Sequence, residues 1–136
     1  MIVLDTDVLS FLLRSSSSAR RSEAVRAAQE VATRGEQLAT TRLNVAELYV
    51  GIFLSPDPAV QELRLATLLS GLVVLELDVS SARRFGQVES HLRAEGAVIG
   101  EFDTLVACIA LSNDSAILTG NRKHFERVPG LQIVTF

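Results

Sequence analysis

Short apolar runs alternate along this chain with longer segments in which apolar residues recur every three or four positions. The short runs predict strands at residues 2–4, 37–41, 72–77, 116–119 and 132–135. The longer segments predict helices at residues 20–34, 43–53, 60–69, 80–95 and 102–111, a first helix carrying Val8, Leu9, Leu12 and Leu13, and a helical turn at 123–125. Strands separated by helices favour an α/β fold, here a three-layer αβα sandwich with a mostly parallel sheet, as a single domain over residues 1–136.

Helix-capping and helix-breaking residues mark the boundaries of these elements. Thr6 or Asp7 is expected to cap the first helix, because short polar side chains accept hydrogen bonds from the free backbone N–H groups there. The serine run at residues 15–18 predicts a turn or a helix start. Pro56 and Pro58 are expected to end the helix at residues 43–53.

Composition places the chain among ordinary globular proteins. Hydrophobic residues make up 48% of it and charged residues 21%, while aromatic residues are only 5% and Trp is absent, so aliphatic side chains must fill the core. The lone cysteine, Cys108, lies in an apolar run and predicts a buried thiol in a reducing cytoplasm. The N-terminus has no basic lead, and no apolar run is long enough to cross a membrane, so we expect a cytoplasmic protein without membrane attachment.

Acidic residues stand at three places beside predicted apolar elements. Asp5 directly follows an apolar strand, so its carboxylate needs a compensating partner. Glu47 is surrounded in sequence by apolar residues of a predicted helix, and Asp103 begins an almost wholly apolar one. Asp7 and Glu101 lie beside Asp5 and Asp103. Each of these acids has a purely structural alternative, as a helix cap or on a solvated helix face.

Polar residues also follow the predicted strand at 116–119. Thr119 can position a water or phosphate oxygen, and Asn121 can offer its carbonyl oxygen to a metal, although Gly and Asn are also natural at a strand-end turn. His124, shortly after, is more typical of a surface or capping histidine than of a ligand. Active sites of parallel sheets lie at the carboxyl ends of the strands, so Asp5 and Thr119 are expected to meet there. Carboxylate and water oxygens are the ligands preferred by Mg²⁺ and Mn²⁺.

Together these segments resemble the PIN-domain family, and most closely the VapC-type toxins of toxin–antitoxin pairs. The matching pieces are Val3-Leu4-Asp5-Thr6-Asp7-Val8-Leu9, Ala46-Glu47-Leu48-Tyr49-Val50-Gly51, Ile99-Gly100-Glu101-Phe102-Asp103-Thr104-Leu105-Val106-Ala107 and Leu118-Thr119-Gly120-Asn121-Arg122-Lys123-His124-Phe125. The resemblance implies an αβα fold and an RNA endonuclease in which acids matching Asp5, Glu47 and Asp103 bind a divalent metal. A fourth acid often stands where this chain has Asn121, and that departure bears on a second metal site more than on the first.

In metal-dependent cleavage of RNA, each of these residues would have its own role. A cation held by Asp5 and Asp103, Mg²⁺ or Mn²⁺, would lower the pKa of a bound water and polarise the phosphodiester. Glu47 would complete the site or accept the proton of the water. Further polar side chains are expected to support the pocket or to orient the phosphate: Thr6, Asp7, Glu101, Thr119 and Asn121.

The resemblance also implies partners: an RNA substrate, a small antitoxin that blocks the pocket, and a second copy of the chain in a homodimer. The leucine-rich segments agree with such surfaces or belong to the core, and the residues concerned are Leu48, Ile52, Leu63, Leu65, Leu68 and Leu69. With a net charge of −3, the chain must bind RNA locally, through a metal and a few basic residues. Those considered are Arg83, Arg84, Arg93, Arg122 and Lys123.

Two alternatives remain open at the level of sequence. A phosphotransferase of the haloacid dehalogenase type would use Asp5 as a nucleophile, but it needs an acidic pair late in the chain, and Glu126 is the only acid after Lys123. A PIN-fold binding module without activity would agree with Asn121 at the fourth acidic position. Phospho-aspartate trapping would support the first alternative, and failure to bind Mg²⁺ or Mn²⁺ the second.

Overall fold

The computed structural model describes residues 1–14 and 17–136, and a parallel sheet lies at its centre. The five strands run in the order β3-β2-β1-β4-β5, and each pairs with its neighbours in parallel. Their bounds are β1 (Ile2–Leu4), β2 (Leu38–Thr41), β3 (Val73–Leu75), β4 (Ala116–Leu118) and β5 (Ile133–Val134). Each strand lies within a predicted apolar run, so the predicted α/β fold is confirmed.

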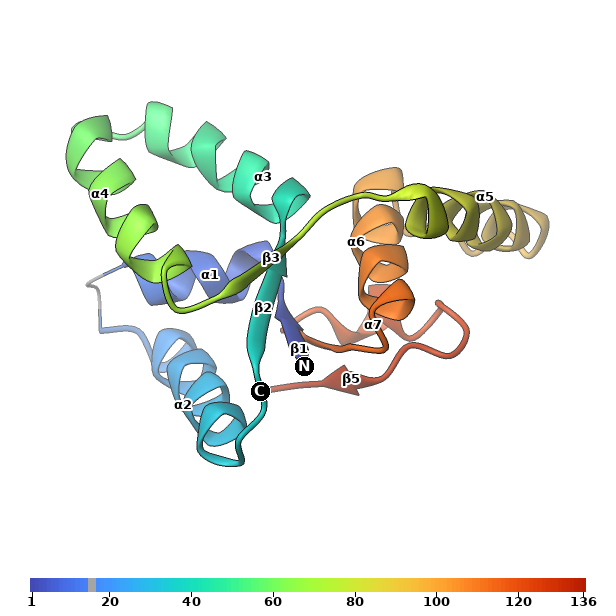
Figure 1. Cartoon of the computed structure of the whole chain (residues 1–136), viewed down its shortest axis with the longest axis horizontal. Coiled ribbons are helices and arrows are strands. Elements are labelled where there is room, and N and C mark those ends of the chain that lie inside the picture. The colour runs from blue at the N-terminus through green and yellow to red at the C-terminus, as the bar shows by residue number, and fades with distance from the viewer. Residues whose placement is uncertain (15–16) are drawn as a thin grey trace.

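Helices cover both faces of this sheet and make the three layers (Figure 1). One face carries α1 (Thr6–Leu13), α2 (Ala19–Thr33), α3 (Arg42–Phe53) and α4 (Pro58–Leu69). The other carries α5 (Val79–Ala94), α6 (Glu101–Ser112) and the short α7 (Arg122–Phe125). Because β1 is the middle strand, the residue that follows it lies at the centre of one sheet edge.

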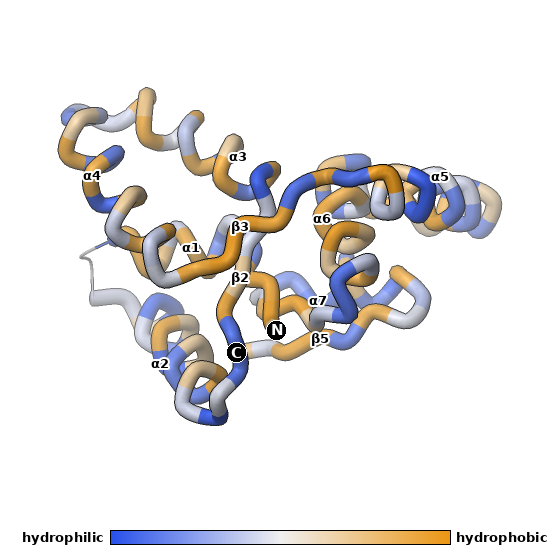
Figure 2. The backbone as a smooth tube through the Cα atoms, in the orientation of Figure 1, coloured by the Kyte–Doolittle hydropathy of each residue, from blue (hydrophilic) through white to orange (hydrophobic). Residues whose placement is uncertain are grey.

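Alternating side chains of the buried strands join two separate apolar layers. Ile2 and Leu4 of β1 pack with the core beneath α1 to α4, while Val3 points into the core beneath α5 and α6. Figure 2 shows the strands mostly in hydrophobic colours, whereas hydrophobic and hydrophilic residues alternate along the helices. Complete burial of one such aliphatic side chain stabilises the fold by roughly 1.5–3 kcal/mol. Cys108 is buried on α6, as predicted.

Helix starts differ from the sequence prediction in two places. Asp5, and not Thr6 or Asp7, is the N-cap of α1, because its Oδ1 accepts a hydrogen bond from the Val8 N–H at 2.9 Å. Pro58 begins α4, with Asp57 as the cap, since a proline at the first helical position lacks only an N–H that would have no partner there. Ser18 caps α2, as the serine run predicted, whereas Ser15 and Ser16 lie outside the described residues.

The leucine-rich helices α3 and α4 divide between core and surface. Leu48, Ile52 and Leu65 are buried, so of the two alternatives the core holds for them. Leu63 is 71% exposed, whereas Leu68 and Leu69 are half-buried against the core. Within residues 1–14 and 17–136, none of the helices has the length and apolar character needed to span a membrane.

Candidate metal-dependent nuclease site

Two neighbouring strands bring Asp5 and Thr119 together at the carboxyl edge of the sheet. Leu4 at the end of β1 pairs with Leu118 at the end of β4, and the Asp5 N–H donates to the Leu118 carbonyl at 3.3 Å. The Thr119 hydroxyl donates a hydrogen bond to Asp5 Oδ2. Thr119 Oγ1 in turn accepts from the Asn121 N–H at 2.9 Å, so one hydroxyl connects the carboxylate to the following loop.

Helix α3 places Glu47 beside the start of α1. Thr41 caps this helix, and its hydroxyl donates to Asn44 Oδ1 at 2.6 Å, which orients the amide. Asn44 Nδ2 then donates to Thr6 Oγ1 at 3.0 Å, and the Thr6 hydroxyl donates to Glu47 Oε2. This chain of hydrogen bonds sets the position of the Glu47 carboxylate relative to the start of α1.

The first turn of α6 supplies Asp103. Gly100 precedes this helix with φ +99, a conformation that side chains rarely adopt, and it directs the chain into α6. Asp103 Oδ2 lies 3.0 Å from Nδ1 of His124, which is on the short α7. Glu101, also in the first turn, instead pairs with Arg93 at 3.1 Å.

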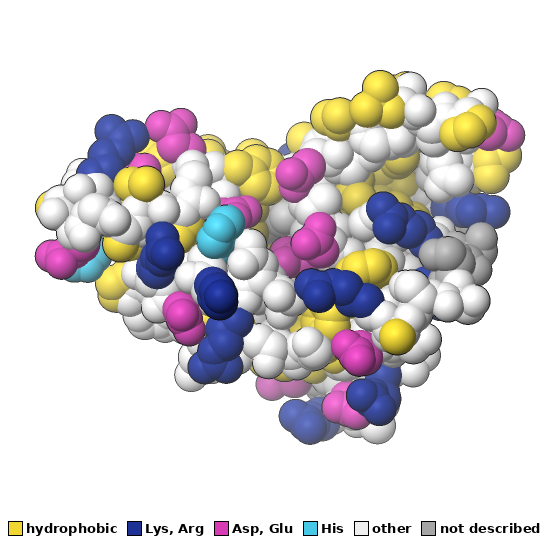
Figure 3. Space-filling view, turned by 180° about the vertical axis from the view of Figure 1, so that it is seen from behind, with side chains coloured by type: hydrophobic (Ala, Val, Ile, Leu, Met, Phe, Trp, Pro, Cys, Tyr) yellow, Lys and Arg dark blue, Asp and Glu magenta, His cyan; other side chains and the backbone are white. Residues whose placement is uncertain are grey.

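These side chains enclose a small recess of about 120 Å³, called the acidic recess below. Its lining is Asp5, Thr6, Asp7, Asn44, Glu47, Asp103, Asn121 and Phe125. Figure 3 shows acidic side chains gathered near the middle of this face of the molecule. The structure therefore brings together the sequence-predicted residues around one recess, with Thr119 bonded to Asp5, but it leaves Glu101 outside.

Asp5 has the most perturbed electrostatics of the recess. Its side chain is buried, and burial raises its pKa to about 6, although hydrogen bonds from Thr119 and Val8 oppose the shift. The nearby charges of Asp7 and Asp103 raise the pKa further. No Lys or Arg is among the residues that line the recess, so a cation bound there would stabilise the Asp5 carboxylate.

The donor set fits a hard divalent cation in its chemistry. Carboxylate, hydroxyl and amide oxygens converge on the recess, and Mg²⁺ and Mn²⁺ prefer such ligands. Across the part of the chain that the structure describes, no three acidic, His or Cys side chains are close enough to hold an ion together. Glu47 accepts a hydrogen bond from Thr6, and Asp103 contacts His124.

A family model for the PIN domain matches residues 2–131. The chain belongs to the PIN-domain family. This membership confirms the resemblance that the sequence motifs carried, and it favours the nuclease over the phosphotransferase alternative.

Three similar proteins refine the assignment of this PIN domain. Ribonuclease VapC2 of Haemophilus influenzae is 31% identical over 96 residues, which cover 71% of this chain and 73% of the relative. The tRNA(fMet)-specific endonuclease VapC of Shigella flexneri is 26% identical over 130 residues, or 96% and 93% of the two chains. The VapBC-1 structure from nontypeable Haemophilus influenzae superposes with a TM-score of 0.84 at 26% identity, covering 99% and 98% of the two chains. The first likeness places the PIN domain among the VapC ribonucleases.

Two residues of the PIN-domain site were not among the predicted site residues. Asn44 is buried and bonded to Thr6, but in the sequence it is one polar residue in an apolar helix. His124 contacts Asp103 although a surface role was favoured for it. In the sequence, a site role for His124 is indicated only by its position just after the strand-end loop that carries Thr119 and Asn121.

Proposed function

We propose that this chain is the toxin of a toxin–antitoxin pair and cleaves RNA as an endonuclease that depends on Mg²⁺ or Mn²⁺. Asp5, Glu47 and Asp103 are the proposed catalytic residues, and Asp5 and Asp103 the proposed metal ligands. One observation carries the proposal: three acids far apart in sequence, just after β1, on α3 and on α6, line a single recess around a buried carboxylate. Family membership supports the nuclease activity.

Each residue of the acidic recess has its own role in the proposed mechanism. A divalent cation bound there would supply Lewis acidity toward the phosphodiester and toward a water molecule. Asp5 and Asp103 provide anionic oxygens for binding, and the Thr119 hydroxyl holds Asp5 in orientation. Glu47, which accepts a hydrogen bond from Thr6, would accept a proton from the attacking water. Asn121 lines the recess and orients phosphate or water through its amide.

The proposed substrate and protein partner come from the relatives. The Shigella relative is described as a tRNA(fMet)-specific endonuclease, and solved neighbours are VapBC complexes of Haemophilus and Salmonella. We therefore propose a cellular RNA as substrate, cleaved in the cytoplasm, and a cognate antitoxin as partner. An apolar hollow of about 600 Å³ between α1, α2 and α4 offers a surface for an antitoxin segment, with Leu12, Val60 and Leu63 in its lining.

The homodimer is also part of the proposal, and the outer face of α3 supports it. Val50 and Phe53 are 61% and 62% exposed, and Leu54 just after the helix is 81% exposed. Tyr49 stacks on Phe53, with ring centroids 6.0 Å apart. Apolar residues gathered on one helix face are typical of interaction surfaces. A Phe53→Asp variant that elutes as a smaller species than wild type in size-exclusion chromatography would support this face as the dimer interface.

A matched pair of variants on α6 tests the proposed activity. Asp103 lines the recess, whereas Glu101, also in the first turn, pairs with Arg93 outside it. We expect Asp103→Asn to abolish cleavage of labelled single-stranded RNA in Mg²⁺ or Mn²⁺, and Glu101→Gln to cleave like wild type. Wild-type cleavage should stop in EDTA.

Metal-dependent cleavage by Asp103→Asn at the wild-type rate would contradict the assignment. If wild-type protein binds neither Mg²⁺ nor Mn²⁺ in calorimetric titrations, a PIN-fold binding module without activity becomes the better description. Binding and cleavage are thus measured separately.

A further inference from the structure

An acidic recess repels the phosphates of an RNA strand, so binding requires positive charge beside it. Two of the basic residues considered from the sequence are already paired. Arg93 contacts Glu89 and Glu101, and Arg122 lies 3.6 Å from Glu126. Their charge is therefore partly neutralised, and other arginines near the recess are better candidates for phosphate binding.

Two arginines and two phenylalanines form a cluster at the ends of α1, α2 and β5. The Phe11 and Phe136 rings meet edge to face with centroids 6.4 Å apart. The Arg20 guanidinium lies 5.7 Å from the Phe136 centroid, and the Arg14 guanidinium 6.0 Å from the Phe11 centroid. These four residues are called the Arg–Phe cluster below. Cation–π contact at such distances orients a guanidinium without neutralising its charge.

Sheet order places this cluster beside the acidic recess. Strand β4 lies between β1 and β5, so the carboxyl edge presents Asp5, then the loop after Leu118, then the segment that ends in Phe136. A Cβ added to Gly120 would lie 2.4 Å from Arg20 Nη2 and 3.1 Å from the Phe136 ring. The Arg20 guanidinium therefore packs against the backbone of the loop whose next residue, Asn121, lines the recess.

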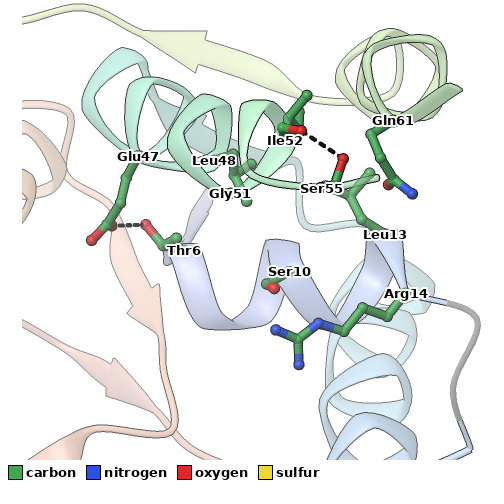
Figure 4. A pocket seen from close by; sticks show the side chains of 10 residues that line it. All are labelled: Thr6, Ser10, Leu13, Arg14, Glu47, Leu48, Gly51, Ile52, Ser55 and Gln61. Atoms are coloured by element: carbon green, nitrogen blue, oxygen red, sulfur yellow. Dashed lines mark hydrogen bonds between the residues drawn. The ribbon is translucent and has the colours of Figure 1, made fainter. Parts of the chain in front are cut away.

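A groove joins the recess to the second arginine. It has a volume of about 340 Å³ and runs between α1, α3 and α4. Figure 4 shows Thr6 and Glu47 toward one end of this groove and Arg14 toward the other, with Ser10 between them. Thr6 and Glu47 line the acidic recess as well, so the two hollows share a wall.

Both guanidinium groups are free to bind an anion. Within residues 1–14 and 17–136, neither Arg14 nor Arg20 forms an ion pair with a carboxylate, and both side chains are exposed. A guanidinium presents several N–H donors in a plane and binds phosphate oxygens in pairs. Phe11 and Phe136 supply support rather than hydrogen bonds, so the donors of each guanidinium remain available.

We propose that Arg14 and Arg20 bind the phosphates of single-stranded RNA that flank the one in the acidic recess, and that Phe11 and Phe136 hold the two guanidinium groups in place. The proposal rests on the proposed ribonuclease function and adds the surface that receives the substrate backbone. Phosphate is the recognised group, so binding is expected to be largely independent of base identity.

The test measures binding of a short fluorescein-labelled single-stranded RNA by anisotropy, in EDTA and over a range of salt concentrations. We expect Arg20→Ala to weaken binding about tenfold, because a charge-assisted hydrogen bond is lost. The slope of log affinity against log salt should also fall by about 0.7, the value for one phosphate contact on a single strand. Arg20→Lys should preserve the slope, which separates lost charge from lost structure.

Two further variants keep every charge but disturb the guanidinium position. Gly120→Ala places a methyl group where Arg20 Nη2 lies, and Phe136→Leu removes the supporting ring. Both should weaken RNA binding with little change in the salt slope. Arg26→Ala is the matched control, because Arg26 is exposed on the same helix but lines a separate hollow with Gln29 and Arg34.

The outcomes distinguish this proposal from the proposed function. If wild type cleaves RNA in Mg²⁺ or Mn²⁺ but Arg20→Ala and Phe136→Leu bind RNA like wild type, the phosphate-binding role is wrong and the nuclease assignment stands. If wild type binds RNA through the Arg–Phe cluster but does not cleave it, the nuclease assignment is wrong and the phosphate-binding role stands. Loss of binding to an antitoxin tail peptide, with RNA affinity unchanged, would identify the cluster as a peptide site and overturn the proposal.

Discussion

Asp5 and Glu89 are both buried carboxylates, 7% and 6% exposed, yet they have different surroundings. Asp5 accepts hydrogen bonds from Val8 and Thr119 and faces a recess lined by other oxygen donors. Glu89, on α5, pairs through Oε1 with Arg93 at 3.3 Å, while its Oε2 has no hydrogen-bond partner in the described part of the chain.

The difference shows that burial of an acid is not sufficient to identify a functional site. Glu89 lies where α5 packs on α6, near Cys108, whose pKa is raised to about 11 mainly by burial. No oxygen-lined recess includes Glu89 among those described, whereas Asp5 shares its recess with Glu47 and Asp103. Convergence of acids from separate elements on one hollow is therefore the distinguishing property of Asp5.

The largest expected difference between Asp5 and Glu89 is their effect on the rate of RNA cleavage. We expect Asp5→Asn to lower the rate of RNA cleavage by on the order of 10³ or more, because loss of a metal ligand removes several kcal/mol of transition-state stabilisation. Glu89→Gln, an equal change at the other buried acid, should leave the rate within about twofold of wild type, since its site takes no part in the proposed chemistry. Single-turnover cleavage of labelled RNA compares the two variants, and equal losses would remove the distinction.

A smaller effect concerns the pH dependence of stability without metal. Burial raises the Asp5 pKa from 3.8 to about 6, so the folded state binds this proton more tightly than the unfolded state does. The Asp5 contribution is therefore fully present below pH 3.8 and is lost as the pH rises through about 6, at a total cost of about 3 kcal/mol.

Urea unfolding of wild type and Asp5→Asn between pH 4 and 7 in EDTA measures this contribution. The stability difference between the two proteins should shift in favour of Asp5→Asn as the pH rises. A difference that stays constant over this range would show that Asp5 does not titrate there.

Metal binding should partly offset the loss of folding stability that ionisation of Asp5 causes. A cation that binds only the folded state at a concentration about 100 times its Kd stabilises it by about 2.7 kcal/mol. We expect Mg²⁺ or Mn²⁺ to raise the melting temperature of wild type and of Glu89→Gln, but not that of Asp5→Asn. Differential scanning calorimetry with and without the ion tests this, and NaCl at the same ionic strength controls for general ionic effects. Equal stabilisation of all three proteins would place the ion elsewhere.

Local patterns in the sequence were sufficient to predict Asp5 and the sheet. An apolar run ending in a carboxylate predicts a buried strand with an acid at its carboxyl end, and the structure has that arrangement at Leu4 and Asp5. Asp103 and Glu101 could not be separated in the same way. Residues two positions apart on a helix point in widely different directions, so the orientation of α6 decides which one faces the recess.

Other features depend on contacts between distant segments, which no local pattern reports. The Asp103–His124 contact and the packing of Arg20 on Gly120 join residues that meet only after the sheet has formed. Arg14 and Arg20 were therefore absent from the basic residues considered for RNA binding. The burial of Glu89 could not be predicted from the sequence either. Its helix α5 carries many charged residues, and only packing against α6 buries this one.

The smallest expected effect is at Glu89 itself and concerns stability alone. Replacement by Leu removes a buried carboxylate oxygen that has no hydrogen-bond partner in the described residues, and the exposed Arg93 partner can return to solvent. We expect Glu89→Leu to raise the free energy of unfolding by about 1 kcal/mol, measured by urea denaturation at pH 7. Glu89→Gln keeps a polar atom in that position and should gain less. A loss of stability in Glu89→Leu would mean that the carboxylate is well solvated or bonded, so Glu89 and Asp5 would no longer be comparable buried acids.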